Sequence, residues 1–314
     1  MSQPGTETGT TRTPLGRLTD AVTVGGYRAG ALLAKALPAV VAEGLATPIG
    51  FGASFANLER RAIVERHLRR VRPDWQPWRV RQAAQEAFDS YARYWIEALR
   101  LPGLSVRTIA RGINLTGFEQ VDAALGAGSG AILALPHLGG WEWAGRWIGD
   151  TGRRITVVVE RLEPPELFEW FVDLRTRLGM NVVPLGPHVS REVLAALGRN
   201  EIVCLLSDRV VGGGGIEVDF FGERTTIPAG PATLGLRAGA PVFPCAAYFT
   251  RRVNGHQVLV RPPISAARQG SLRDDVTRMS QDLADELENL IRRAPEQWHL
   301  FQPNWPSDPG YIRR

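Results

Sequence analysis

The stretch AILALPHLGGWEWAG, residues 131–145, decides how this chain is expected to fold. Ala131–Leu135 is a short apolar run of the length of a buried strand. Pro136 ends the run, because proline cannot donate to a strand ladder. His137 then lies on the turn at the carboxyl end of the strand, and residues 141–149 are expected to form a helix. The stretch predicts a strand–turn–helix unit of an α/β protein.

This turn is a candidate catalytic site, because open α/β sheets bind ligands beyond the carboxyl ends of their strands. Gly139 and Gly140 are expected to keep the turn tight and to let a substrate approach the backbone. A neutral His137 could take a proton from an alcohol that attacks a carbonyl, and Glu142, five residues further on, is expected to orient its ring. A surface histidine and a glutamate favoured by the helix dipole explain the spacing equally well.

The remaining chain predicts strands that alternate with helices. Two helices are expected between residues 21 and 70, and one over 77–100. Strands are expected over 113–117, 155–159, 181–184, 201–206, 216–220, 242–248 and 257–260, and helices over 118–125, 165–178, 190–199, 232–238 and 272–291. This order predicts an α/β fold with a mostly parallel sheet and helices on both faces. Residues 1–20 are expected to be a disordered tail, and 21–314 a single domain whose part 21–100 is helical.

Polar residues follow three of the expected strands. His137 follows LALP, Glu160 ends VVVE, and Asp208 and Arg209 end CLLSDR. If the strands are neighbours, these side chains converge at one edge of the sheet, which is typical of an active site. For Asp208 and Arg209 a local ion pair in a loop is an equally good explanation.

Charge favours an anionic partner, since the net charge is +5 and the isoelectric point is near 9.7. Nucleic acid, an anionic membrane and a phosphorylated cofactor all qualify. No nucleic-acid-reading module is recognisable, so nucleic acid is not expected. The apolar segment 27–58 is interrupted by charges, prolines and glycines, which favours amphipathic helices on a core or a membrane surface. The eight arginines between residues 60 and 81 are typical of a solvated helix face or a basic band.

Several other motifs do not indicate a site. GAGSG at 126–130 precedes a strand, and GGGG at 212–215 has no following GK[ST], so neither is a phosphate loop. The chain has no G-x-S-x-G elbow, and no metal site is expected. The remaining histidines lack carboxylate spacing or ligand partners: His67, His188, His256 and His299. Cys204 and Cys245 lie in apolar runs and are expected to be buried, reduced thiols.

Ordered blocks of the sequence resemble a known family. LPHLGGWEWAG is similar to the His-x-x-x-x-Asp/Glu motif of the lysophospholipid and lauroyl/myristoyl acyltransferase superfamily. More closely, the chain resembles the actinobacterial phosphatidylinositol mannoside acyltransferases from about residue 20 onward. The similarity is concentrated in SYARYWIEALRLP, LPHLGGWEWAG, VVVERLEPPELFEWFVDLRTRLGMNVVPL, CLLSDR, GIEVDFFGE, IPAGPATLGLRAGAPVFP and WHLFQPNW.

The resemblance assigns roles to particular residues. His137 matches the family's general base, and Glu142 the acidic member of its motif, which is usually an aspartate. Asp208 stands where close relatives have a glutamate that supports the histidine, and its shorter side chain is expected to reach through a water. Glu160 and Arg175 match polar positions that line the family's groove, and Arg209 is expected to bind substrate beside them.

The resemblance also implies a glycerolipid-acyltransferase-like fold with membrane-associating N-terminal helices. It implies direct transfer of a fatty acyl chain, expected to be palmitoyl, from acyl-CoA to a mannose hydroxyl of a phosphatidyl-myo-inositol mannoside. Acyl-CoA would be a co-substrate, and neither a metal nor another cofactor is expected. The protein would bind peripherally to the cytoplasmic face of the cell membrane. Another glycolipid or lysophospholipid acceptor, or non-catalytic lipid binding on the same fold, remains the alternative.

Overall fold

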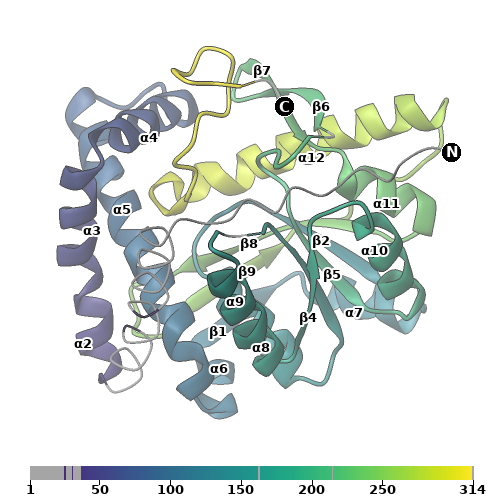
Figure 1. The fold of residues 1–314 in the computed structure, drawn as a ribbon. Helices are drawn as coiled ribbons and strands as arrows, with labels where there is room; N and C mark the ends of the chain where they lie inside the picture. Colours follow the sequence, from purple (N-terminus) through teal and green to yellow (C-terminus); the bar gives the residue numbers. More distant parts are fainter. Residues whose placement is uncertain (1–24, 26–29, 31–36, 162, 214, 313–314) are drawn as a thin grey trace, which may run out of the picture.

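The computed structural model describes residues 25, 30, 37–161, 163–213 and 215–312 (Figure 1). The predicted disordered tail, residues 1–20, lies outside these residues. The helices are α2 (Ala39–Gly44), α3 (Ala46–Ala56), α4 (Leu58–Val71), α5 (Pro77–Arg100), α6 (Val106–Gly112), α7 (Glu119–Gly126), α8 (Trp141–Asp150), α9 (Pro165–Arg177), α10 (Val189–Gly198), α11 (Gly230–Ala238) and α12 (Leu272–Arg293), with 3-10 turns at Leu101–Gly103 and Pro295–Gln297. The strands are β1 (Ile113–Thr116), β2 (Ala131–Leu135), β3 (Ile155–Val159), β4 (Met180–Pro184), β5 (Ile202–Leu206), β6 (Gly215–Phe220), β7 (Glu223–Pro228), β8 (Val242–Phe249) and β9 (His256–Val260).

A seven-stranded sheet forms the centre of the fold, in the order β1-β9-β8-β2-β5-β3-β4. Every neighbouring pair in it is parallel except β8 and β9, which form an antiparallel pair. Parallel pairing follows from the helices that cross between most successive strands. The predicted mostly parallel sheet is confirmed, and β2, the strand before His137, lies in its middle.

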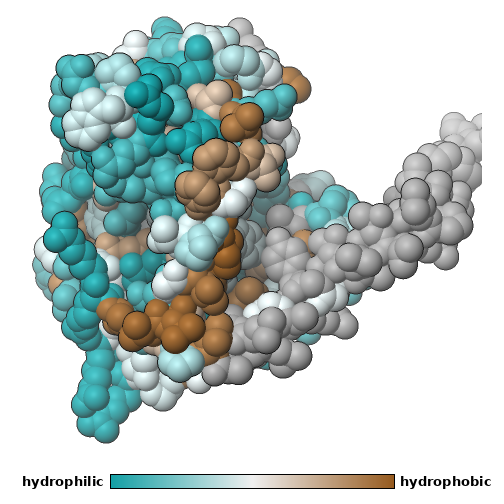
Figure 2. Space-filling model, turned by 90° about the vertical axis from the view of Figure 1, so that its left-hand side faces the viewer, coloured by the Kyte–Doolittle hydropathy of each residue, from teal (hydrophilic) through white to brown (hydrophobic). Residues whose placement is uncertain are grey.

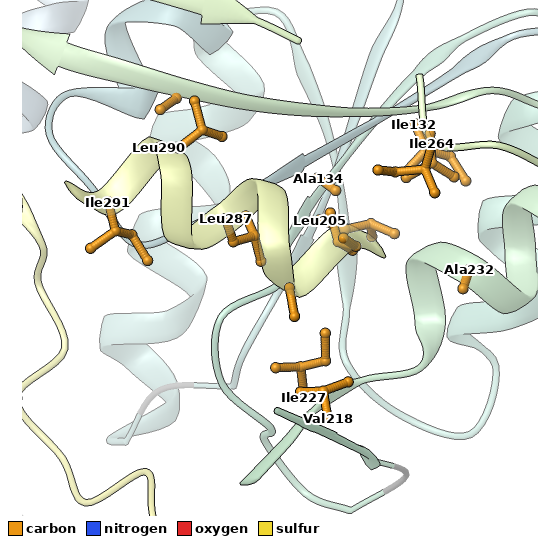
Figure 3. Close-up of a cluster of buried hydrophobic side chains, with 14 of the residues drawn as sticks. Ile132, Ala134, Leu205, Val218, Ile227, Ala232, Ile264, Leu287, Leu290 and Ile291 are labelled. Atoms are coloured by element: carbon orange, nitrogen blue, oxygen red, sulfur yellow. The ribbon is translucent and has the colours of Figure 1, made fainter. Parts of the chain in front are cut away.

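Helices cover both faces of this sheet, as predicted (Figure 1). Successive side chains of a strand point to opposite faces, so β2 contributes to two cores. Ile132 and Ala134 pack with residues of α10, α11 and α12 in one core, part of which Figure 3 shows. Leu133 and Leu135 pack with residues of α6, α8 and α9 in the other. Because β2 is buried on both faces, it reads as a continuous apolar run.

The N-terminal helices differ from the prediction of two helices. Within the described residues the segment up to Val71 forms three, since Leu45 separates α2 from α3 and Asn57, with φ −132° and ψ 62°, breaks α3 from α4. The long helix α5 matches the prediction over 77–100. Its apolar stripe contacts α3 and α4 and forms a separate core around Phe88 and Phe301.

Two elements were not predicted from the sequence. Helix α6 begins after Ser105, whose hydroxyl accepts the Thr108 N–H as an N-cap. Strand β7 pairs with β6 in an antiparallel hairpin, and the two turn residues Phe221 and Gly222 have φ of 50° and 76°. Positive φ at both positions is the geometry of a tight hairpin turn, which rarely takes phenylalanine, so the usual sequence signal was missing.

Candidate active site

The polar strand ends converge as the sequence predicts. β2, β5 and β3 are consecutive in the sheet, and Leu135 lies in register with Leu206. The carboxyl ends of these parallel strands therefore meet at one edge. There Arg209 donates to Glu160, with 2.7 Å between Nη2 and Oε2. This pair is partly exposed, so it fixes the position of Arg209 more than it stabilises the fold.

The central contact of this edge joins His137 to Asp208. Nδ1 of the His137 ring lies 2.6 Å from Oδ1 of Asp208. The backbone N–H of His137 donates to Oδ2 of the same carboxylate at 3.1 Å. The contact is direct, so the expectation that Asp208 reaches through a water is wrong. The backbone bond explains the difference, because it draws the carboxylate against the turn. Nδ1 thus carries the proton, and Nε2 is left as the basic nitrogen.

The two partners differ in exposure. Asp208 is fully buried, whereas the His137 side chain is 17% exposed. Burial alone would raise the pKa of Asp208. The charge of His137 and hydrogen bonds from His137 and Trp298 outweigh burial, and they hold that pKa below its ordinary value. Asp208 therefore stays ionised and can stabilise a protonated His137.

Glu142 does not orient His137, contrary to the prediction. Its buried carboxylate accepts hydrogen bonds from Tyr94 Oη at 3.1 Å and from Arg175 Nε at 3.1 Å, and it forms an ion pair with Arg175. Burial lowers the pKa of Arg175, but the charge of Glu142 outweighs it and raises that pKa above its ordinary value. Glu142 and Arg175 therefore tie α8 to α9, with Tyr94 joining them from α5.

Geometry explains why the five-residue spacing misled the sequence analysis. Glu142 lies in the first turn of α8 and is directed into the protein interior. Its neighbour Trp141 takes the place beside the histidine, since its ring centroid lies 5.9 Å from that of His137 in an edge-on contact. Tyr94 stacks on the other side of Trp141 at 4.3 Å. The helix thus brings an aromatic ring, not a carboxylate, to the reacting edge.

The glycines of the turn are required for packing. Gly139 has φ of +62°, and a Cβ there would lie 2.2 Å from the carbonyl oxygen of Ala247. A Cβ on Gly140 would lie 2.6 Å from the His256 ring. The tight turn is confirmed. However, β8 and β9 fill the space beside these glycines, so no room is left there for a substrate.

Two other histidines have carboxylate partners that the sequence analysis missed. His67 Nε2 lies 3.1 Å from Asp308, and His256 Nε2 lies 2.8 Å from Glu97. These partners are 241 and 159 residues away, so spacing could not reveal them. Within the part of the chain that the structure describes, no three His, Cys, Asp or Glu residues are grouped to hold a metal ion.

Two apolar hollows bear on this site, although His137 itself lines neither of them. The first, here called the sheet cavity, lies between the sheet and α8, and its lining includes Trp141, Leu135 and Ala247. The second, here called the helix groove, has a volume of about 490 Å³ and lies between α2, α3 and α5. Tyr91 lines that groove, and its ring contacts the ring of His299. The backbone N–H of His299 in turn donates to the His137 carbonyl at 2.7 Å. The sheet cavity therefore reaches Trp141, which contacts His137, whereas the helix groove is linked to His137 only through other residues.

The cysteines are poor nucleophiles. Cys245 is buried, and Cys204 is partly exposed on the wall of the sheet cavity, so the expectation of burial holds fully for Cys245 alone. Burial raises the pKa of the Cys204 thiol to about 12 and also raises that of Cys245. A protonated thiol does not attack a thioester readily.

Comparisons with known proteins show which family this chain resembles. The family model of bacterial lipid A biosynthesis acyltransferases matches residues 17–307. The chain is 41% identical over 233 residues to the phosphatidylinositol mannoside acyltransferase of Mycobacterium tuberculosis, covering 73% of this chain and 72% of that protein. It is 37% identical over 310 residues to that of Mycolicibacterium smegmatis, covering 96% and 97%. A lipid A biosynthesis acyltransferase of Haemophilus influenzae is 21% identical over 272 residues, covering 85% and 82%. The chain belongs to this family of bacterial acyltransferases.

Proposed function

We propose that the protein transfers a fatty acyl chain, palmitoyl in the first instance, from acyl-CoA to a mannose hydroxyl of a phosphatidyl-myo-inositol mannoside. The observation that carries the proposal is the His137–Asp208 pair beside an apolar cavity at the edge of the sheet. The named mycobacterial relatives support the acceptor class. Direct transfer suits this site, because neither thiol is ionised near neutral pH.

His137 acts as the general base in this mechanism. Its Nε2 takes the proton of the mannose hydroxyl while the sugar oxygen attacks the thioester carbonyl. Asp208 keeps Nδ1 protonated and stabilises the imidazolium that forms. When the tetrahedral intermediate collapses, the carbon–sulfur bond breaks and His137 returns the proton to the CoA sulfur. The products are the acylated sugar and free CoA, and the histidine is neutral again.

We place the part of the acyl chain next to the thioester in the sheet cavity, whose volume is about 90 Å³. Its walls are aliphatic and aromatic apart from the Glu142–Arg175 pair and the two cysteines, Cys204 and Cys245. A chain lying along Trp141 places its thioester next to His137, since the two rings are in contact. Burial of each methylene contributes roughly 0.8 kcal/mol, so even the few methylenes that fit into this cavity favour binding. Arg209 remains at the mouth of the site for the phosphates of CoA or of the acceptor.

The first test is His137→Ala. The side chain is partly exposed, so the variant is expected to fold, and acyl transfer is expected to fall by roughly 10²–10⁴-fold, the usual scale for loss of a general base. The measurement is transfer from palmitoyl-CoA to purified mannoside, with other glycolipids and a lysophospholipid as competing acceptors. Transfer within tenfold of wild type contradicts the role and favours a non-catalytic lipid-binding protein. Faster transfer to another acceptor favours the alternative substrate.

Peripheral binding to an anionic membrane is the second part of the proposal. By length and composition alone, the 18-residue helical stretch Ala39–Ala56 could cross a membrane. Large apolar side chains are exposed on α2 and α3, and Figure 2 shows them as a hydrophobic band: Val40, Val41, Leu45, Ile49, Phe51 and Phe55. The exposed Arg60 and Arg81 form no ion pair with any described residue. An apolar face beside unpaired cations is typical of an interfacial helix.

Vesicle flotation tests this binding. Anionic vesicles are expected to bind the protein better than neutral ones, and the difference is expected to shrink with salt. Phe51→Ser with Phe55→Ser should release the protein from both kinds of vesicle. Trp78→Ser is the control, because the Trp78 side chain is exposed to a similar extent, at 61%, but lies outside α2 and α3. Equal flotation with neutral and anionic vesicles at low salt contradicts the electrostatic part of the proposal.

A further inference from the structure

The segment after α12 reaches the active site from the far end of the chain. Leu138 and Trp298 form an antiparallel bridge, and the His299 N–H donates to the His137 carbonyl. Asn304 Nδ2 donates to the Asp208 carbonyl at 3.3 Å. The segment therefore contacts both the histidine and the aspartate of the catalytic pair, although it is 90 or more residues away from either in sequence.

One contact in this segment bears directly on the chemistry. Nε1 of Trp298 donates to Oδ2 of Asp208 at 2.7 Å, and both side chains are buried. Oδ2 also accepts the His137 N–H, so both of its hydrogen bonds come from fixed donors. These donors hold the plane of the carboxylate, and Oδ1 is left facing Nδ1 of the histidine. A carboxylate without the indole would be freer to rotate and would be a stronger base.

We propose that Trp298 is a positioning residue of this enzyme, which acts through Asp208 to aim the His137 ring and to set its basicity. The inference rests on the proposed function, in which His137 is the base. Its physical content is one charge-assisted hydrogen bond, because the indole N–H is a donor that cannot titrate and has no acceptor role. Trp298 also packs against His67, Phe221 and Trp305. The test must therefore distinguish the hydrogen bond of its N–H from the packing of its ring.

Trp298→Phe separates the two tasks, since it keeps a ring in the aromatic cluster and removes the N–H. The expected result is a fall in kcat of about tenfold with little change in KM, because the loss of one charge-assisted bond is felt mainly in the transition state. The acid limb of the pH–rate profile should also move to higher pH. Without the indole, Asp208 attracts the His137 proton more strongly, and the pKa of the histidine rises.

We expect His137, and not the titratable groups packed around it, to produce the acid limb of this pH–rate profile. Burial lowers the pKa of His299 to about 3, so that ring stays neutral in any ordinary assay. Burial raises the pKa of Tyr94 well above its ordinary value, so the phenol also stays neutral. Glu142 is held in a buried ion pair with Arg175, and Glu160 in a partly exposed ion pair with Arg209. NMR titration of the His137 ring without substrate gives a second, activity-independent readout.

Trp305→Phe is the matched control. Trp305 is fully buried in the same cluster, and its Nε1 donates at 3.0 Å to the Phe220 carbonyl instead of to Asp208. It should lower stability without moving the pH profile. If Trp298→Phe does not fold, benzothienylalanine at position 298 replaces the N–H by sulfur in a ring of the same shape. The same shift in the titration of His137 is then expected.

The outcomes distinguish this inference from the proposed function. If wild type transfers acyl groups, His137→Ala does not, and Trp298→Phe leaves both kcat and the His137 titration as in Trp305→Phe, then Trp298 is only a packing residue and the inference fails. If His137→Ala remains active, the proposed function fails, and the titration of His137 in Trp298→Phe still reports whether the indole sets its pKa.

Discussion

His137 and His67 each hydrogen-bond an aspartate from a distant part of the sequence, but their second ring nitrogens differ. Nδ1 of His67 contacts the Leu300 carbonyl at 3.1 Å, so both nitrogens of this ring are occupied. Nε2 of His137 has no hydrogen bond to any residue within the described ranges, and its side chain is 17% exposed against 2% for His67. Of these two rings, only that of His137 therefore has a nitrogen that is free to exchange a proton with a substrate.

A histidine–carboxylate pair is therefore not by itself a catalytic site. Asp308 accepts N–H groups of Asn304 and Trp305 and pairs with Arg66 and Arg70, so it anchors the C-terminal segment to α4. Asp208 uses the same kinds of donors to leave one imidazole nitrogen at an open edge. What separates the two pairs is access for a substrate, which the sheet edge provides.

The largest expected effect separates the two aspartates. Asp208→Asn should lower kcat by roughly 10²–10⁴-fold in protein that remains folded, because the amide cannot stabilise the imidazolium or hold the required tautomer. Asp308→Asn should leave kcat within a few-fold of wild type in the folded fraction. Acyl-transfer kinetics on both purified variants, with circular dichroism to measure folding, check the prediction. A comparable loss of kcat in both variants would remove the distinction.

Stability should respond in the opposite way. Burial raises the pKa of Asp308, but hydrogen bonds from His67 and the Asn304 and Trp305 backbone outweigh it and lower that pKa. The folded-state pKa then lies below the unfolded value of about 3.9, so the contribution to stability is complete above that value and is lost as the pH falls. Asp308→Asn should unfold at lower denaturant concentration at pH 7, and its deficit relative to wild type should shrink toward pH 3.

Glu142→Gln tests the carboxylate that the sequence predicted next to His137. The variant leaves Arg175 buried beside a neutral amide, so the free energy of unfolding should fall by about 3–5 kcal/mol. The acid limb of the pH–rate profile should stay where it is in wild type, because Glu142 does not contact His137. Chemical denaturation and the pH–rate profile measure both effects. A shifted acid limb with unchanged stability would restore the role predicted from spacing.

The smallest effect concerns Cys204. Cys204→Ser should retain acyl transfer, and intact-protein mass spectrometry after incubation with acyl-CoA alone should show no acyl-enzyme. Cys204→Phe, which fills the sheet cavity, should reduce transfer of a long chain more than transfer of a short one. A stoichiometric adduct that the acceptor removes would contradict direct transfer. Equal rates for long and short chains in Cys204→Phe would place the acyl chain elsewhere.

Much of the site could be predicted from the sequence because it depends on local patterns. An apolar run closed by Pro136 and followed by two glycines gives a strand end wherever it lies in a protein. Three apolar runs with crossing helices put His137, Glu160 and Asp208 at one edge, since parallel strands share their direction. Strand β7 was missed because its turn uses Phe221, and the helix break at Asn57 has no proline or glycine.

Most helices and strands, and the edge of the sheet at which the polar residues gather, could be predicted from the sequence, but α6, β7 and the break at Asn57 could not. Tertiary structure alone decided which carboxylate pairs with His137, because the direction in which α8 carries Glu142 depends on its packing against α5 and α9. It also decided that Trp298 donates a hydrogen bond to Asp208, which lies 90 residues away in the sequence. Local periodicity is set by neighbours along the chain, whereas a hydrogen bond between distant residues is set by the packing of the whole fold.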